Sequence, residues 1–247
     1  MIKICTVYFE GLYTPDYVSK LYKSLKRNTS IPFEFICLSD NPNVEADIIL
    51  PYNKHSDIKL HWHKLKFFSS LFGYQKPGDE IIIMDIDQVI TNNVDDLIGH
   101  PVAYNELVTY GVWWPSLMSI NGGFYKFNSG NFNYIWDDFA ENPEYWQMYY
   151  FRNKEVHFKY YGEQNYVNMK LHSKNMKITK TPEKWMCKYT DNKKEMMTLN
   201  KVYKRKFNTE YMLLDEPNDM IKVIHFTGPN KTIHKYNEKF IKDNWYE

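Results

Sequence analysis

Two aspartates, Asp85 and Asp87, directly follow the apolar run 81–84 (IIIM). In an extended chain, residues i and i+2 point to the same face, so the two carboxylates converge while Ile86 points into the core. Such a pair repels itself unless a cation lies between the carboxylates, and hard oxygen ligands suit Mn²⁺ or Mg²⁺. The alternative is that one aspartate caps the next turn and the other is solvated. The run 81–84 is typical of a strand buried on both faces. Open α/β sheets bind ligands at the carboxyl ends of such strands, which favours a metal site.

A second set of reactive residues lies near the C-terminus, where His225, Gly228 and Lys231 occur within seven positions. An imidazole can be a third metal ligand, and it favours Mn²⁺ over Mg²⁺. Glycine lets the backbone approach a phosphate, and lysine supplies a point charge for one. Lys64 is a second candidate cation. A lone histidine is more often a hydrogen-bonded core side chain, but these three residue types together favour a metal–diphosphate site.

The elements that must position these groups alternate between strands and helices. In the first part of the chain, hydrophobic patterns predict strands at 2–8, 33–38 and 81–84 and helices at 15–27 and 61–73. This order builds a parallel sheet. Further strands are predicted at 120–127 and 222–226, and further helices at 131–140 and 163–172. The charged segment 181–220 has no clear period and is predicted to form loops.

Length and composition favour one α/β domain covering residues 1–247. A chain of this size can bury about 70% of its unfolded surface, so its core needs no disulfide or structural metal. Cys5, Cys37 and Cys187 are odd in number and widely spaced, which indicates reduced thiols and a cytoplasmic location. No run approaches the ~18 apolar residues of a membrane span. The net charge of +1 argues against nucleic acid as a partner.

These segments together resemble the GT-A type nucleotide-sugar glycosyltransferases, most closely the retaining group of glycogenin and the bacterial lipopolysaccharide glucosyl- and galactosyltransferases. The resemblance covers positions 4–231 and implies a Rossmann-like fold. Its mostly parallel central sheet would be flanked by helices and followed by an irregular C-terminal part. The segments that match the family motifs in order are Thr6-Val7-Tyr8, His63-Lys64-Leu65, Asp85-Ile86-Asp87, Asn121-Gly122-Gly123, Gly162-Glu163-Gln164 and His225-Phe226-Thr227-Gly228-Pro229-Asn230-Lys231.

The resemblance also implies roles for these residues. The first segment would hold the uracil and ribose of the donor, and Lys64 and Lys231 would reach its phosphates. Asp85, Asp87 and His225 would bind Mn²⁺ or Mg²⁺, and Gly228 would let the diphosphate loop close. The segment 121–123 would lie near the donor sugar. It lacks the hydroxyl residue of the family, and Glu163 replaces an aspartate.

The function implied is metal-dependent transfer of a hexose from a UDP-sugar with retention of the anomeric configuration. We expect the acceptor to enter on the leaving-group face, with Gln164 and Glu163 orienting the sugar. Glu163 is also the one candidate for a nucleophile in a two-step alternative. The acceptor is left open among a saccharide, a lipid-linked molecule and a protein, and the sequence allows a homodimer.

Two other functions stay open. The pattern that begins at Asp85 also fits D-x-D-x-[TV] of haloacid-dehalogenase-type phosphatases, whose first aspartate attacks phosphate. There the motif follows the first core strand, whereas two βα units are predicted ahead of it here. The non-enzyme alternative is a carbohydrate- or nucleotide-binding module that has lost turnover, although all three metal ligands are present.

Two aromatic segments are ambiguous. Trp113 and Trp114 could form a platform for a sugar ring, because apolar sugar faces stack on indoles, or they could anchor a loop on the core. His61 and His63 could suggest a metal site. Side chains at i and i+2 of a helix diverge, so both are expected to be surface histidines.

Overall fold

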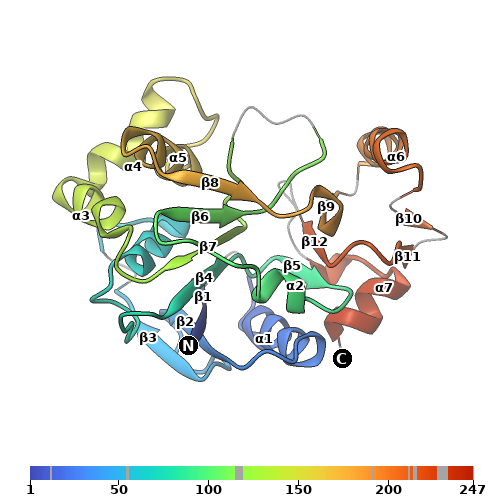
Figure 1. Ribbon diagram of the computed structural model, residues 1–247, viewed down its shortest axis with the longest axis horizontal. Helices are drawn as coiled ribbons and strands as arrows, with labels where there is room; N and C mark the ends of the chain where they lie inside the picture. Colours follow the sequence, from blue (N-terminus) through green and yellow to red (C-terminus); the bar gives the residue numbers. More distant parts are fainter. Residues whose placement is uncertain are drawn as a thin grey trace.

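The computed structural model describes residues 1–11, 13–53, 56–114, 119–190, 192–210, 212–213, 216–226 and 233–246. Its centre is a seven-stranded sheet with the order β3-β2-β1-β4-β7-β6-β8 (Figure 1). All neighbouring strands in this sheet are parallel except β7, which is antiparallel to both β4 and β6. The strands are β1 Ile2–Tyr8, β2 Phe33–Ser39, β3 Ile48–Pro51, β4 Glu80–Met84, β6 Glu106–Thr109, β7 Phe124–Asn128 and β8 Lys177–Lys180.

Strand β4 has apolar side chains on both faces because both faces of the sheet are covered. Ile82 and Met84 pack in one hydrophobic cluster, whereas Ile81 and Ile83 pack in another. All four side chains are buried, and each contributes about 1.5–3 kcal/mol by leaving water. The prediction of a doubly buried strand at 81–84 is therefore confirmed.

Each face of the sheet has its own layer of helices (Figure 1). The first cluster contains the buried side of α1, Asp16–Asn28, whose residues Tyr17, Val18 and Leu21 are fully buried. The second cluster contains residues of η1, Leu60–Phe68, α3, Asn133–Glu141, α4, Pro143–Arg152, and α5, Glu163–Ser173. The mostly parallel α/β sheet flanked by helices is the fold class predicted from the sequence.

A smaller three-stranded sheet lies beside the large one and holds the C-terminal part of the site. Its central strand β12, Val223–Phe226, is antiparallel to β5, Gln88–Ile90, and parallel to β9, Met186–Tyr189. Three residues, 85–87, separate the end of β4 from the start of β5. The turn 85–87 therefore joins the two sheets, and β12 is held directly against it.

Two predicted segments differ from the structure. The helix predicted at 61–73 is a 3₁₀ helix that ends at Phe68, and Leu71 is 97% exposed because the chain has already turned away. The segment 181–220 is not loops, since it holds β9 and the 15-residue helix α6, Lys193–Phe207. Leu199 and Tyr203 are the only buried residues of this helix. With so few buried positions among many charged ones, the sequence shows no clear helical period.

The remaining elements are short. They are α2 Asp95–Ile98, η2 Glu183–Trp185, β10 Met212–Leu213, β11 Glu216–Pro217, η3 Ile233–Lys235, α7 Lys239–Ile241 and η4 Lys242–Tyr246. Cys5, Cys37 and Cys187 are fully buried free thiols. Within the described ranges, every helix is too short or too polar to serve as a membrane span.

Candidate active site

A cavity of ≈680 Å³ opens where β1, β4 and β12 end. Val7, at the end of β1, lines one side of it, and Lys64 of η1 lines another. The turn 85–87 forms its floor together with His225. Because ligands of open α/β sheets bind at the carboxyl ends of the strands, this is where the fold predicts a site.

Asp85, Asp87 and His225 meet in this cavity. The Nε2 atom of His225 lies 3.2 Å from Oδ1 of Asp87 and 3.9 Å from Oδ2 of Asp85. One ligand atom from each residue lies within 4.8 Å of the other two. The pairing of β12 with β5 sets His225 opposite Gln88 and so brings the imidazole to a carboxylate 138 positions away.

This donor set fits a divalent cation. At bonds of about 2.1 Å, adjacent ligands of an octahedral ion are roughly 3.0 Å apart and opposite ligands about 4.2 Å apart. Both distances from the imidazole nitrogen fall within that interval. Among the described residues, Lys64 is the ammonium that contacts these two carboxylates, and one positive charge does not neutralise both of them. Carboxylate oxygens with one imidazole suit Mn²⁺ or Mg²⁺.

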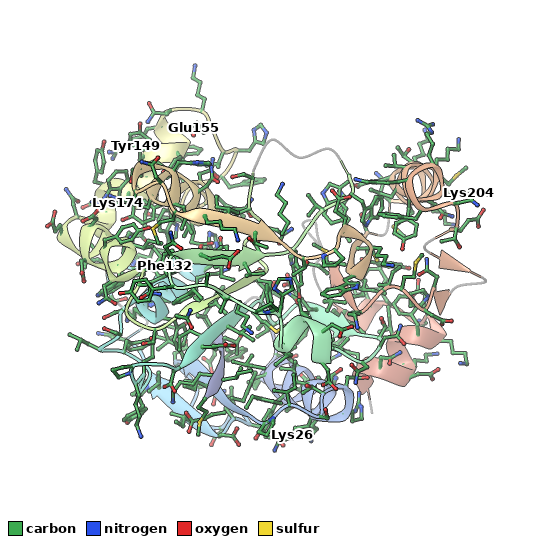
Figure 2. All side chains as sticks on the ribbon, in the orientation of Figure 1. Lys26, Phe132, Tyr149, Glu155, Lys174 and Lys204 are labelled. Atoms are coloured by element: carbon green, nitrogen blue, oxygen red, sulfur yellow. The ribbon has the colours of Figure 1, made fainter. Side chains whose placement is uncertain are left out.

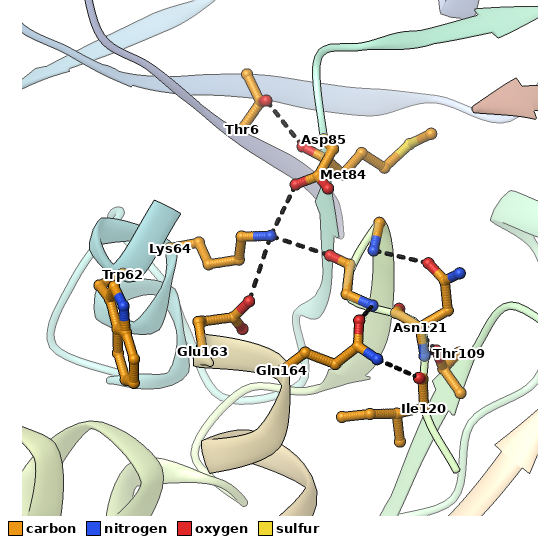
Figure 3. A network of polar contacts seen from close by, with 12 residues as sticks. Thr6, Trp62, Lys64, Met84, Asp85, Thr109, Ile120, Asn121, Glu163 and Gln164 are labelled. Atoms are coloured by element: carbon orange, nitrogen blue, oxygen red, sulfur yellow. Dashed lines mark hydrogen bonds and ion pairs between the residues drawn. The ribbon is translucent and has the colours of Figure 1, made fainter. Parts of the chain in front are cut away.

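The Lys64 ammonium is buried among three acceptors (Figure 3). It donates to Oδ1 of Asp85 at 2.7 Å and to the carbonyl of Gly122 at 3.0 Å, and it lies 3.6 Å from Oε2 of Glu163. Burial lowers the pKa of Lys64, but Asp85 and Glu163 together raise it above its usual value. The lysine is therefore charged at neutral pH and orients Asp85. Contact with a donor phosphate requires it to exchange one of these partners.

Glu163 is a buried carboxyl at the first turn of α5. Burial raises its pKa to about 7, although the charge of Lys64 opposes the shift. Its Oε1 atom has no hydrogen-bond partner among the described residues. At neutral pH both the protonated and the ionised form are accessible, so this carboxyl can donate as well as accept a hydrogen bond.

Gln164 fixes the backbone that borders the cavity (Figure 3). Its Oε1 accepts from the amide of Gly122 at 2.9 Å, and its Nε2 donates to the carbonyl of Ile120 at 2.9 Å. Asn121 Oδ1 accepts from the amide of Gly123 at 2.9 Å. A Cβ atom at Gly123 would lie 3.1 Å from the imidazole of His225, so the second glycine leaves room for the histidine.

The predicted nucleotide-binding segment 6–8 is only partly in the cavity. Val7 lines it. The hydroxyl of Thr6 instead donates to the carbonyl of Met84 at 2.8 Å, which ties β1 to β4. Tyr8 is buried and donates to the carbonyl of Tyr13. Thr6 and Tyr8 therefore support the wall of the cavity without lining it. Ile86 does line the cavity, although its side chain is buried.

Three further residues reach the site without having been expected there. Tyr13 donates to Oδ2 of Asp87 at 2.8 Å, and burial and the neighbouring Asp87 charge raise its pKa so that it keeps this proton. Gln88 donates to the carbonyl of Gly123 at 2.6 Å. Lys188 lines the cavity from β9, in register with His225. Tyr13 follows the first strand, and that position is the signal that could have indicated it.

The ambiguous aromatic pair separates into two roles. Trp113 is buried and donates to the carbonyl of Met186 at 2.9 Å, so it anchors the chain on the core. Trp114 lines the cavity. Only one of the two is therefore placed to contact a sugar.

The prediction that His61 and His63 both lie on the surface is wrong for His63. The His63 ring is buried, with its centroid 4.2 Å from that of Tyr52. Burial lowers its pKa to about 4, so it is neutral at pH 7. The short 3₁₀ helix turns both His63 and Trp62 inward.

Gly228 and Lys231 lie outside the described residues, so their predicted roles at the diphosphate remain predictions. The phosphatase alternative requires its motif to follow the first core strand. Here Asp85 follows β4, the fourth strand along the chain, which argues against that function.

Neither protein-family models nor curated protein sequences give a match to this chain. Solved structures do. The glycosyltransferase GlyE of Streptococcus pneumoniae TIGR4 has a TM-score of 0.62 and 13% identity, over 99% of this chain and 59% of that one. The galactosyltransferase LgtC, solved with donor and acceptor sugar analogues, has a TM-score of 0.53 and 13% identity, over 92% of this chain and 87% of that one. The bifunctional glycosyltransferase WbbM has a TM-score of 0.53 and 14% identity, over 93% of this chain and 46% of that one. At such identities the likeness is one of fold, and the fold of this chain is that of the GT-A glycosyltransferases.

Proposed function

We propose that this chain is a metal-dependent glycosyltransferase that moves a hexose from a UDP-sugar to an acceptor with retention of the anomeric configuration. The observation that carries the proposal is the convergence of Asp85, Asp87 and His225 in a cavity at the strand ends of a GT-A fold. The glycosyltransferases that share this fold support the reaction class.

The donor would lie across the cavity from β1 toward α5. Its base and ribose would contact Val7, and Asp85, Asp87 and His225 would hold the divalent ion beside its diphosphate. Lys188, on the same face of the small sheet as His225, would add a positive charge there by exchanging its ion pair with Glu195 for the diphosphate. The hexose would then lie against the backbone that Gln164 holds.

The difficult step is departure of the nucleoside diphosphate, whose negative charge grows as the glycosidic bond breaks. A bound divalent ion supplies Lewis acidity against that charge. The chain itself would supply cations beside that charge, once Lys64 exchanges one of its present partners for a phosphate oxygen. The buried Glu163 carboxyl is held 3.6 Å from the ammonium of Lys64, which supports an orienting role for this residue, with acceptor attack on the leaving-group face.

A thermal-shift experiment tests the metal site. UDP should raise the melting temperature of the parent protein only when Mn²⁺ is present, because a ligand that binds only the folded state stabilises it. Asp87→Asn and His225→Ala should lose most of this metal-dependent shift. Asp137→Asn, an exposed position on α3, is the matched control and should respond like the parent. Equal responses from all four proteins would contradict the site.

Turnover is tested by hydrolysis of UDP-sugars with Mn²⁺ in the absence of an acceptor, followed by NMR of the released sugar. We expect slow hydrolysis with the donor's anomeric configuration retained. A product of inverted configuration would refute retention but would leave the proposed transferase activity standing. Tight UDP binding with no hydrolysis of any UDP-sugar would favour the binding module.

A further inference from the structure

The loop between α4 and α5 contributes one wall of the cavity. Phe158 and Tyr161 line the cavity, yet their side chains are 66% and 40% exposed. Their ring centroids lie 5.6 Å apart, and the ring of Tyr161 lies 5.2 Å from that of His61. Exposed aromatic rings grouped inside a cavity indicate a surface that a ligand covers.

This loop is fastened to the fold at both of its ends by hydrogen bonds. Lys154 and Tyr160 have positive φ angles of 60° and 63°, which are uncommon for residues other than glycine and mark local backbone strain. The indole of Trp62 donates to the carbonyl of Tyr160 at 2.8 Å, and the amide of Glu155 donates to the carbonyl of Tyr150 at 2.9 Å. The aromatic wall is therefore presented by a pinned loop.

A second cavity of ≈340 Å³ is lined by residues of α4 and α5 and by Glu155 of the loop. It shares Glu155 and Asn165 with the main cavity, so the two cavities are neighbours that meet at these residues. Figure 2 shows Glu155 and Tyr149 close together at the end of α4. The remaining lining combines aromatic rings with one amide and one thioether: Tyr145, Trp146, Tyr149, Tyr150, Asn168 and Met169.

We propose that the two cavities form one cleft for an oligosaccharide acceptor, a proposal that rests on the proposed function. The ring that receives the hexose would lie against Phe158 and Tyr161, and the next rings would pass Glu155 into the second cavity. A sugar ring has an apolar face, which stacks on aromatic rings, and hydroxyls, which bond to carboxylates and amides. An acyl chain would leave the carboxylate and amides that line the cleft without hydrogen bonds.

The acceptor hydroxyl oxygen bonds to the anomeric carbon while the bond from that carbon to the β-phosphate oxygen breaks. The nucleoside diphosphate leaves with the electron pair, and the hydroxyl proton passes to a phosphate oxygen. The acceptor end must therefore lie beside the turn 85–87, and both parts of the cleft border the same loop.

The test uses as donor the UDP-sugar that the protein hydrolyses in the presence of Mn²⁺. It measures transfer to reducing-end-labelled saccharides of one to five rings from the malto-, cello-, chito- and lacto-series. We expect transfer in at least one series, with KM for the acceptor falling about tenfold from one ring to three or more. A peptide hydroxyl and a polyprenyl phosphate serve as the other acceptor classes. Equal KM values at every length, or transfer to a non-sugar acceptor alone, would overturn the proposal. So would no transfer in any series while hydrolysis proceeds.

Two variants locate the cleft. Tyr145→Ala should raise the KM for long acceptors about tenfold, which removes the length dependence, while single-ring acceptors change little. Phe158→Ala should reduce transfer about tenfold more than it reduces donor hydrolysis. Tyr104→Ala, a 76% exposed tyrosine outside both cavities, is the control and should match the parent. Unchanged length dependence in Tyr145→Ala would overturn the proposal, whereas loss of hydrolysis in the parent would instead refute the proposed function.

Discussion

Glu163 shows how burial sets the chemistry of a single residue. Its carboxyl is 3% exposed and faces Lys64, and burial is the larger influence on its pKa, which rises from 4.5 to about 7. The folded state therefore binds a proton that the unfolded state has released between these two pH values. The stability contributed by the protonated carboxyl is present below about pH 4.5 and is lost as the pH rises through 7.

Replacing Glu163 by Gln removes this titration and leaves a neutral side chain of similar size. In metal-free buffer, the free energy of unfolding of Glu163→Gln relative to the parent should increase from pH 5 to pH 8, by up to about 3 kcal/mol. Urea unfolding at several pH values measures it. Glu144→Gln, at the start of α4, is the control and should show no such trend. A constant difference across this range would show that Glu163 titrates normally.

The sequence identified the candidate metal ligands but not the hydrogen-bond partners that hold them in place. Asp85 and Asp87 were found because an apolar strand precedes them, and the structure places both in the cavity. The contacts of Lys64 with Asp85, Gly122 and Glu163 were not predicted, and neither was the hydroxyl of Tyr13, because these groups come from segments that are distant along the chain. Only the three-dimensional packing brings them together.

At the scale of elements, strand pairing positions the site. The register between β9 and β12 sets Lys188 beside His225, and partners in register project to the same face of a sheet. Local hydrophobic patterns predicted β4, β12, α3 and α5 close to their observed bounds. They missed β9 and α6, because long charged side chains mask the few buried positions of α6. The proximity of His225 to Asp87 was implied by family resemblance, not by any local pattern.

Lys188 should therefore contribute to binding of the donor diphosphate. Lys188→Met should weaken Mn²⁺-dependent UDP binding about tenfold, the effect of losing one charge-assisted hydrogen bond. Calorimetric titration at two salt concentrations measures it, and the deficit should shrink at the higher one. Lys184→Met, at a nearby exposed position, should bind UDP like the parent. Parental affinity in Lys188→Met would place the diphosphate elsewhere in the cavity.

At the scale of the whole molecule, two sheets meet at one turn. The large sheet carries β1 and β4, the small one carries β9 and β12, and the turn 85–87 joins them. The strand–helix alternation in the sequence predicted the large sheet. It did not predict the small sheet, because the strands of that sheet come from three distant segments, each of three or four residues.

The three cysteines give each sheet its own built-in reporter. Cys5 and Cys37 lie in β1 and β2 of the large sheet, Cys187 lies in β9 of the small one, and burial raises the pKa of all three thiols. An alkylating reagent can therefore modify each thiol only when its own sheet opens. An ion held by Asp85, Asp87 and His225 would clamp the sheets to each other, so UDP with Mn²⁺ should slow alkylation of Cys187 by at least as much as that of Cys5. Mass spectrometry of timed samples would measure the alkylation rates. Protection confined to Cys5 and Cys37 would mean that the small sheet opens locally at a rate that the ligand does not change.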